Sequence, residues 1–177
     1  MARSKKLSRR NRRLLLAAGV LAFLVLALWF CIYTLLAPNI APRVLYSETA
    51  GCTTRERQLV AGVMKNRIAN PAFGNSPTLE AVVRQPGAFS CIGDPDNANW
   101  QKTLHPDRLK PAERATWEAC IACLQNIPPA YGPSGRPLVY YHDKSITKPR
   151  AWDNAKWHAV RELTTEHFVF YSIVPAK

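Results

Sequence analysis

Acidic residues are missing from the start of this 177-residue chain, whose first 13 residues carry seven Lys or Arg and no Asp or Glu. The other residues hold 17 basic and 12 acidic side chains, so only +5 of the net +12 belongs to them. The high charge is therefore a property of the N-terminal tail. This excludes a uniformly basic nucleic-acid-binding protein, and we expect no nucleic-acid partner.

Charged residues are also absent from residues 14–37, a run of 24 mostly apolar residues. A helix needs about 20 such residues to cross a bilayer, and basic residues beside a span stay in the cytoplasm. We therefore expect a basic cytoplasmic tail (1–13), one transmembrane helix (14–37), a linker (38–42) and an exported domain (43–177). A cleavable signal peptide is the alternative, but its apolar region is shorter, about 7–15 residues, and ends in a small-x-small site.

The exported domain shows helical patterns first and strand patterns later. Residues 43–50, 53–69, 77–85 and 111–126 read as helices, the second opened by a capping box of Thr53 and Glu56. Residues 86–110 are rich in Gly, Pro, Asp and Asn, residues 128–137 are rich in Pro and Gly, and both segments read as irregular. Short aromatic and β-branched runs at 138–142 and 168–174 read as strands. The sequence predicts an α+β domain, mainly α, with a small sheet.

The domain has an even number of cysteines, which favours disulfides in an exported protein and leaves three pairings open: Cys52, Cys91, Cys120 and Cys123. Cys120 and Cys123 form a C-x-x-C in mid-helix, which is not where a redox motif lies. A zinc site would need two more ligands, and His142, His158 and His167 are spread along the chain without a close pair. We expect no metal and no cofactor.

Most acidic residues stand where solvated charges are usual, among them Glu56, Glu80 and Glu113 in first turns of helices. Glu48 differs, because it ends an apolar helix that has to pack. Burial and the helix dipole both disfavour its anion, so its pKa should be raised, as a general acid requires. The alternative is a surface glutamate on a short helix.

Five fragments of the domain occur in the same order as in a known family. They are Tyr46-Ser47-Glu48-Thr49-Ala50-Gly51, Asn66-Arg67 at a helix end, Gln85-Pro86-Gly87-Ala88-Phe89-Ser90, Val139-Tyr140-Tyr141 with Trp152, and His167-Phe168-Val169-Phe170-Tyr171. In these the domain resembles the SleB-type cell wall hydrolases, the spore cortex-lytic enzymes and related peptidoglycan hydrolases. The chain departs from the family's Tyr-x-Glu-Ala-x-Gly-Glu motif at Thr49 and at Cys52, where the second acid would stand.

The resemblance implies a lysozyme-like fold that cleaves the β-1,4 bond between N-acetylmuramic acid and N-acetylglucosamine, often as a lytic transglycosylase. The family's catalytic acid falls on Glu48, and no second acid pairs with it in the sequence. Candidate substrate-binding residues are Gln85, Phe89, Ser90, Tyr140, Tyr141, Trp152 and Asn66. Arg67 is a candidate partner for a stem-peptide carboxylate, whereas His142 and His167 are expected to pack or cap.

The resemblance also implies a pairing of the cysteines and a location of the protein in the cell. In the family's fold the segments around Cys52 and Cys91 line one cleft, so we expect these two to pair. Cys120 and Cys123 would then pair with each other or stay reduced. The partner is peptidoglycan, and the protein is expected in the inner membrane of a bacterium, or of a phage-infected host, with its domain on the extracytoplasmic side.

Two other functions fit the same sequence. The first is a non-catalytic wall-binding scaffold of the same fold, favoured by the changes at Thr49 and Cys52 and opposed by Glu48. The second is a phage lysis protein with the same chemistry. A metallopeptidase is disfavoured, because the sequence has no H-E-x-x-H or comparable ligand set.

Overall fold

The structure, a computed structural model, describes residues 19–20, 24–25, 40–154 and 156–176. The predicted basic tail and most of the predicted span at 14–37 lie outside the described residues. None of the helices in the described part is long and apolar enough to cross a membrane. The chain divides into two compact units, Met1–Pro38 and Asn39–Lys177, and every element named below belongs to the second.

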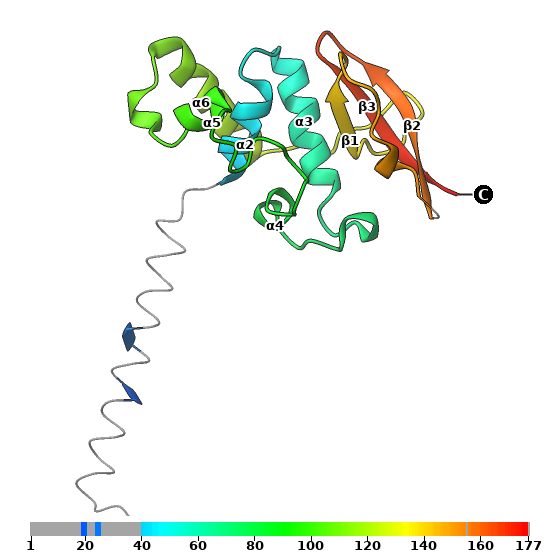
Figure 1. Cartoon of the computed structure of the whole chain (residues 1–177), viewed down its shortest axis with the longest axis horizontal. Coiled ribbons are helices and arrows are strands. Elements are labelled where there is room, and N and C mark those ends of the chain that lie inside the picture. The colour runs from blue at the N-terminus through cyan, green and yellow to red at the C-terminus, as the bar shows by residue number, and fades with distance from the viewer. Residues whose placement is uncertain (1–18, 21–23, 26–39, 155, 177) are drawn as a thin grey trace, which may run out of the picture. The chain divides into compact units, whose positions relative to one another are not determined.

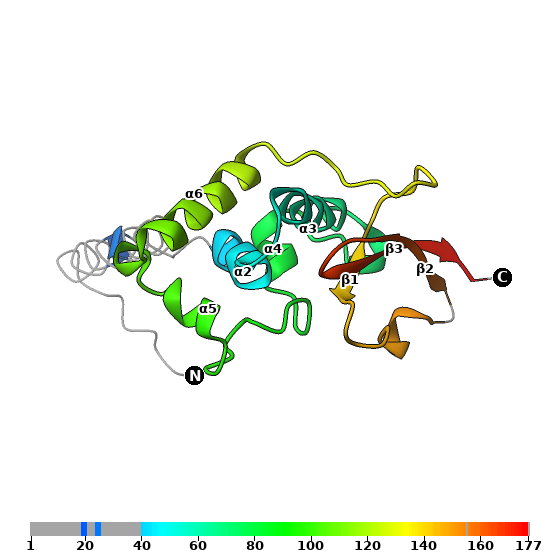
Figure 2. The same ribbon diagram turned by 90° about the horizontal axis from the view of Figure 1, so that it is seen from above.

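One helix lies at the centre of the helical part. This is α2 (Ile40–Thr49), and within residues 40–154 it contacts the helices α3 (Thr54–Asn66), α4 (Leu79–Val83), α5 (Ala98–Lys102) and α6 (Pro111–Gln125) (Figures 1 and 2). Because it is surrounded, its apolar residues are not confined to one stripe: Val44, Leu45 and Tyr46 are all at most 2% exposed. This burial holds the last turn of α2 against the core, with Glu48 half-buried in it.

The strands form one antiparallel sheet in the order β1-β3-β2, made of β1 (Tyr140–Asp143), β2 (Trp157–Thr164) and β3 (Phe168–Pro175). Strand β1 is the edge that contacts α3, so the sheet packs beside the helices through this strand (Figure 1). Tyr141 pairs with Phe170 across β1 and β3. Phe170 belongs to the main hydrophobic core, and Tyr141 packs against this core from β1.

The end of α3 fastens the segment that leads into the sheet. The Asn66 side-chain amide donates to the carbonyl oxygens of Ala130 (2.6 Å) and Leu138 (2.9 Å). The Arg67 Nε donates to the Val139 carbonyl at 2.8 Å. The Asn-Arg pair thus satisfies carbonyl groups of a segment whose own pairing is short, with one isolated bridge between Tyr131 and Pro137.

The predicted α+β class, mainly α, is confirmed, with differences in detail. The first helix begins at Ile40, so it takes in residues 40–42 of the predicted linker. Helix α4 begins at Leu79, not at residue 77, and Thr78 caps it through its side chain. The region predicted to be irregular contains α5, and β2 was not predicted at all. The likeness to lysozyme stays a prediction.

Candidate active site

A cleft of about 720 Å³ lies where the last turn of α2, the loop at residues 85–90 and strand β1 meet. Its lining includes all but one of the predicted catalytic and binding residues: Glu48, Gln85, Phe89, Ser90, Tyr140, Tyr141 and Trp152. Asn66 is not part of this lining, because its amide is used on the two carbonyl groups described above. The fold thus gathers residues up to about a hundred positions apart around Glu48.

Glu48 occupies the buried inner part of the cleft. Its Oε2 accepts a hydrogen bond of 3.0 Å from the Tyr141 hydroxyl, and the Cys91 thiol is a second donor. Burial raises the pKa of Glu48 above its ordinary 4.5, and the hydrogen bonds from Tyr141 and Cys91 and the charge of Arg67 offset this only in part. Glu48 therefore keeps its proton to higher pH than an exposed glutamate, as general acid catalysis requires.

Arg67 brings a buried positive charge to the same cleft. Its side chain is part of the lining, although the residue is only 4% exposed. The guanidinium lies 4.9 Å from the ring centre of Phe73, 5.3 Å from that of Phe89 and 5.5 Å from that of Tyr140. Burial lowers its pKa, yet an arginine stays charged in proteins. No carboxylate of the described residues forms an ion pair with it, so this cation is available to an anionic group in the cleft.

Stacked aromatic rings form one wall. Trp152 stacks on Tyr140 with ring centres 4.5 Å apart and planes 12° from parallel, and Phe73 packs against Tyr140 at 5.1 Å. Tyr140 contacts both other rings, and all three residues line the cleft, so together they offer a ligand one continuous apolar surface. His142 bonds the Tyr171 hydroxyl through Nε2 at 3.0 Å, which supports the rings from behind and agrees with the packing role expected for it.

The loop that follows α4 supplies the opposite side. The Gln85 amide donates to the Phe73 carbonyl and to the Ser76 hydroxyl (2.8 Å), so it holds the loop in shape. Phe89 is buried at 6% exposure, and Ser90 is exposed. Of the predicted polar binders in this loop, Ser90 is therefore the one that a ligand can reach directly.

Sequence reasoning missed a second acid in the cleft, Asp143 at the end of β1. It is exposed and lines the cleft, and it lies two residues after Tyr141, hence on the same face of the strand. Hydrogen bonds from the side chain and backbone of Ser145 lower its pKa. The signal available in the sequence was its position directly after the aromatic run at 138–142.

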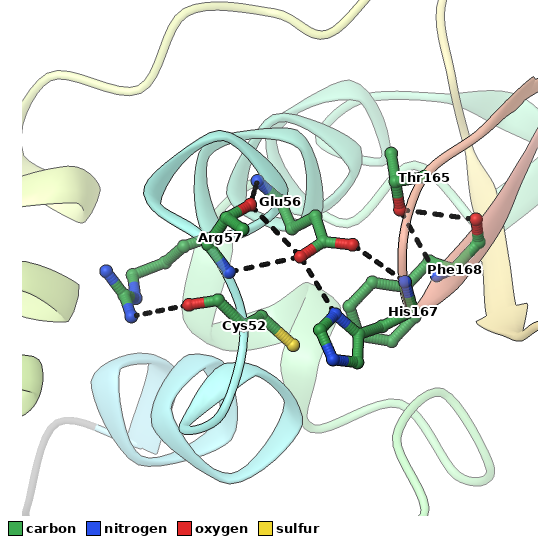
Figure 3. Close-up of polar contacts among 7 residues, drawn as sticks. Cys52, Glu56, Arg57, Thr165, His167 and Phe168 are labelled. Atoms are coloured by element: carbon green, nitrogen blue, oxygen red, sulfur yellow. Dashed lines mark hydrogen bonds and ion pairs between the residues drawn. The ribbon is translucent and has the colours of Figure 1, made fainter.

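Two expectations about neighbouring residues are wrong. Glu56 is not a solvated first-turn acid, because it is 1% exposed and its carboxylate accepts from the His167 backbone at 2.9 Å (Figure 3). The four predicted disulfide candidates are free thiols in the structure. Cys91 lies beside Glu48 and Cys52 lies near Glu56, so the expected Cys52–Cys91 pair does not form.

The fold and the cleft define an α+β protein with a carboxyl group of raised pKa in an aromatic-lined groove, an arrangement typical of glycoside-cleaving enzymes. Residues 53–171 match the family described as Cell Wall Hydrolase, and the chain belongs to this family of peptidoglycan hydrolases. The match begins five residues after Glu48. No curated protein and no solved structure matches the chain.

Proposed function

We propose that this cell wall hydrolase cleaves the β-1,4 bond between N-acetylmuramic acid and N-acetylglucosamine as a lytic transglycosylase, with Glu48 as its single acid and base. The observation that carries the proposal is the buried Glu48 carboxyl group, with its raised pKa, in a cleft large enough for sugar rings. Cleavage of an unactivated glycosidic bond requires a carboxyl group that keeps its proton to higher pH than an exposed glutamate does, and the raised pKa of Glu48 is a shift in this direction.

The reaction uses the same carboxyl group twice. Glu48 first donates its proton to the glycosidic oxygen, and the bond from that oxygen to C1 of the muramoyl residue breaks. The resulting anion then accepts the proton of the muramoyl C6 hydroxyl, whose oxygen attacks C1 and closes a 1,6-anhydro ring. Glu48 is thereby reprotonated, and no water enters the product. Tyr141 stabilises the intermediate anion through its hydrogen bond of 3.0 Å.

The remaining lining fits a peptidoglycan strand. The Tyr140–Trp152 stack offers an apolar wall for a sugar ring, and Ser90 offers an exposed hydroxyl group. The unpaired charge of Arg67 suits the carboxylate of a lactyl group or stem peptide. Each of these groups would bind rather than react.

Hydrolysis is a second candidate mechanism, and Asp143 favours it. Asp143 has a lowered pKa, Glu48 a raised one, and both line the cleft. Two carboxyl groups with pKa values shifted apart are the usual acid and base of a hydrolysing glycosidase. In that case Asp143 would hold and deprotonate the attacking water.

We further propose that the protein works at a bacterial inner membrane, anchored by residues 14–37 with its catalytic domain outside the cytoplasm. The support is the uncharged run of 24 residues after a tail of seven basic residues. Tethering would confine cleavage to wall near the membrane. A reporter that is active only in the cytoplasm, fused after Lys177, should give no signal; a strong signal would reverse the orientation.

Mass spectrometry of peptidoglycan digested by the purified full-length chain tests the reaction. A transglycosylase gives a muramic product that is one water lighter than the hydrolysed sugar. A product that contains the added water would replace transglycosylation by the Asp143-assisted hydrolysis. Binding to the wall without any cleavage, by folded protein, would contradict both and leave the scaffold function.

A further inference from the structure

Three potential metal ligands meet behind the cleft, at the junction of the helices and the sheet. The Cys52 Sγ, a Glu56 carboxylate oxygen and a His167 ring nitrogen all lie within 4.8 Å of one another. They come from the α2–α3 turn, the first turn of α3 and the β2–β3 turn (Figure 3). Figure 3 shows the Cys52 sulfur directed toward the His167 ring and the Glu56 carboxylate directed at the same ring.

We propose that Cys52, Glu56 and His167 bind a zinc ion. One sulfur, one nitrogen and one carboxylate oxygen are the atoms that this borderline-soft ion takes in proteins, and three protein ligands leave one position for water. The side chain of His167 is 39% exposed, so solvent can reach the site. This is the reverse of the expectation from sequence, which predicted no metal because the three histidines are spread along the chain without a close pair.

Between His167 and Glu56 the geometry needs little change. The His167 Nδ1 and Glu56 Oε2 are 3.0 Å apart, and a carboxylate can only accept, so the nitrogen carries the shared proton. Two ligand atoms on a tetrahedral zinc ion, each about 2.0–2.1 Å from it, lie roughly 3.3 Å apart. The ion therefore takes the place of this proton after a small opening. His167 then carries its proton on Nε2, and the Cys52 thiol releases one proton to solvent as the S–Zn bond forms.

The surrounding charge favours a cation. Glu56 is ionised, because hydrogen bonds from Thr165, His167 and Thr53 outweigh the effect of burial and lower its pKa to about 2. Asp143 and Glu166 add negative potential at Cys52, against the one positive charge of Arg57. Arg57 donates to the Cys52 carbonyl at 3.4 Å, and Figure 3 shows its guanidinium on the side away from the sulfur.

Such an ion would cross-link two segments that are far apart in the sequence. It would connect the turn after the Glu48 helix to the turn before β3, residues that are 111 positions apart at Glu56 and His167. Binding to the folded state alone stabilises that state, because unfolding separates the ligands. We therefore expect zinc to raise the melting temperature of the protein.

Cobalt(II) is the probe, because a bound thiolate gives it a near-ultraviolet charge-transfer band. The full-length chain is titrated with CoCl₂ in a non-thiol reductant, followed by ZnCl₂, and its melting is recorded with and without zinc. Cys52→Ser is the main variant, because the Cys52 thiol makes no hydrogen bond that the fold needs. Cys123→Ser is the matched control, since Cys123 is also half-buried but lies outside the site. His167→Gln tests a second ligand.

Wild type and Cys123→Ser should show the band at one cobalt per chain and lose it to zinc. Cys52→Ser should lose the band and bind about 100-fold more weakly or worse, and His167→Gln should bind at least ~10-fold more weakly. No band in the wild type, a band that survives Cys52→Ser, or one that is lost in Cys123→Ser would overturn the site. If Cys52→Ser fails to fold, unweakened binding by His167→Gln would overturn it. Peptidoglycan is used in none of these measurements, so the result is independent of the proposed reaction.

Discussion

Glu48 is an ionisable residue that the fold partly removes from solvent. Its carboxyl group is surrounded by the end of α2, Tyr141 and Cys91, and burial is the largest influence on its pKa. A carboxylate destabilised in this way lowers the stability of the fold whenever it is ionised. The proposed catalytic residue should therefore lower the stability of the folded protein when it is ionised.

This effect predicts the pH dependence of stability of Glu48→Gln. The folded-state pKa lies above the ordinary 4.5, so the native state binds more protons than the unfolded state between these values. The wild type should lose stability as pH rises through that interval, while the glutamine variant should not. Chemical denaturation at a series of pH values should show the variant gaining on the wild type above about pH 4.5 and then levelling off. A stability difference between variant and wild type that does not change with pH would contradict the raised pKa of Glu48.

Tyr141→Phe tests the hydrogen bond to Glu48. The bond of 3.0 Å stabilises the carboxylate, so its loss should raise the pKa of Glu48 further. The alkaline limb of the pH–rate profile should then move upward by about one unit, because a hydrogen bond to a charged group contributes ~1.5–3 kcal/mol and is lost only in part. A limb that stays in place or moves to lower pH would show that the hydroxyl group does not control this proton.

The residue scale also shows where sequence reasoning stops. The raised pKa of Glu48 could be predicted, because the residue ends an apolar helix that has to pack, although a surface glutamate stayed open and only the family resemblance marked it as the catalytic acid. Glu56 was not, because its capping box with Thr53 is complete locally and gives no sign of a partner 111 residues away. The hydrogen bonds that bury Glu56 come from the β2–β3 turn, and only the fold brings that turn to α3.

Among the elements, the helices followed from the sequence more closely than the strands. Helix α3 was predicted from its spacing of apolar residues, and its capping box is present in the structure. Strand β2 is an edge strand, mostly half-exposed, with an irregularity between Arg161 and Leu163. A bulge of this kind interrupts the two-residue alternation on which strand prediction depends.

Helix α3 provides a test of how closely the elements pack. A Cβ at Gly62 would lie 2.5 Å from the Ala130 Cβ and 2.8 Å from its backbone nitrogen. Gly62→Ala gains about 1 kcal/mol of helix propensity, but the clash with backbone should cost about 1–3 kcal/mol, so we expect a net loss or at best no gain. Thermal melting measures it. Gly51→Ala is the control, since its Cβ would meet nothing within 4 Å; clear stabilisation by Gly62→Ala would contradict the close contact.

At the scale of the whole domain, the sequence predicted which residues meet but not all that they do. The segments around Glu48, Gln85 and Tyr140 were expected at one site, and all three line the cleft. Asn66, expected in the same site, instead holds the backbone that leads into β1. A motif shared with a family marks positions under constraint, and it does not distinguish contact with a ligand from contact with the chain's own carbonyl groups.

The central claim is that Glu48 transfers the protons of bond cleavage, and the rate of peptidoglycan cleavage by Glu48→Gln tests it most directly. The amide keeps the shape of the side chain but cannot donate and recover a proton, so the rate should fall by ~10²–10⁴-fold or more, with the circular dichroism spectrum unchanged. Glu118→Gln, which changes an exposed acid on α6, should cleave at the wild-type rate. Activity of Glu48→Gln within a few-fold of wild type, or an equal loss in Glu118→Gln, would contradict the assignment.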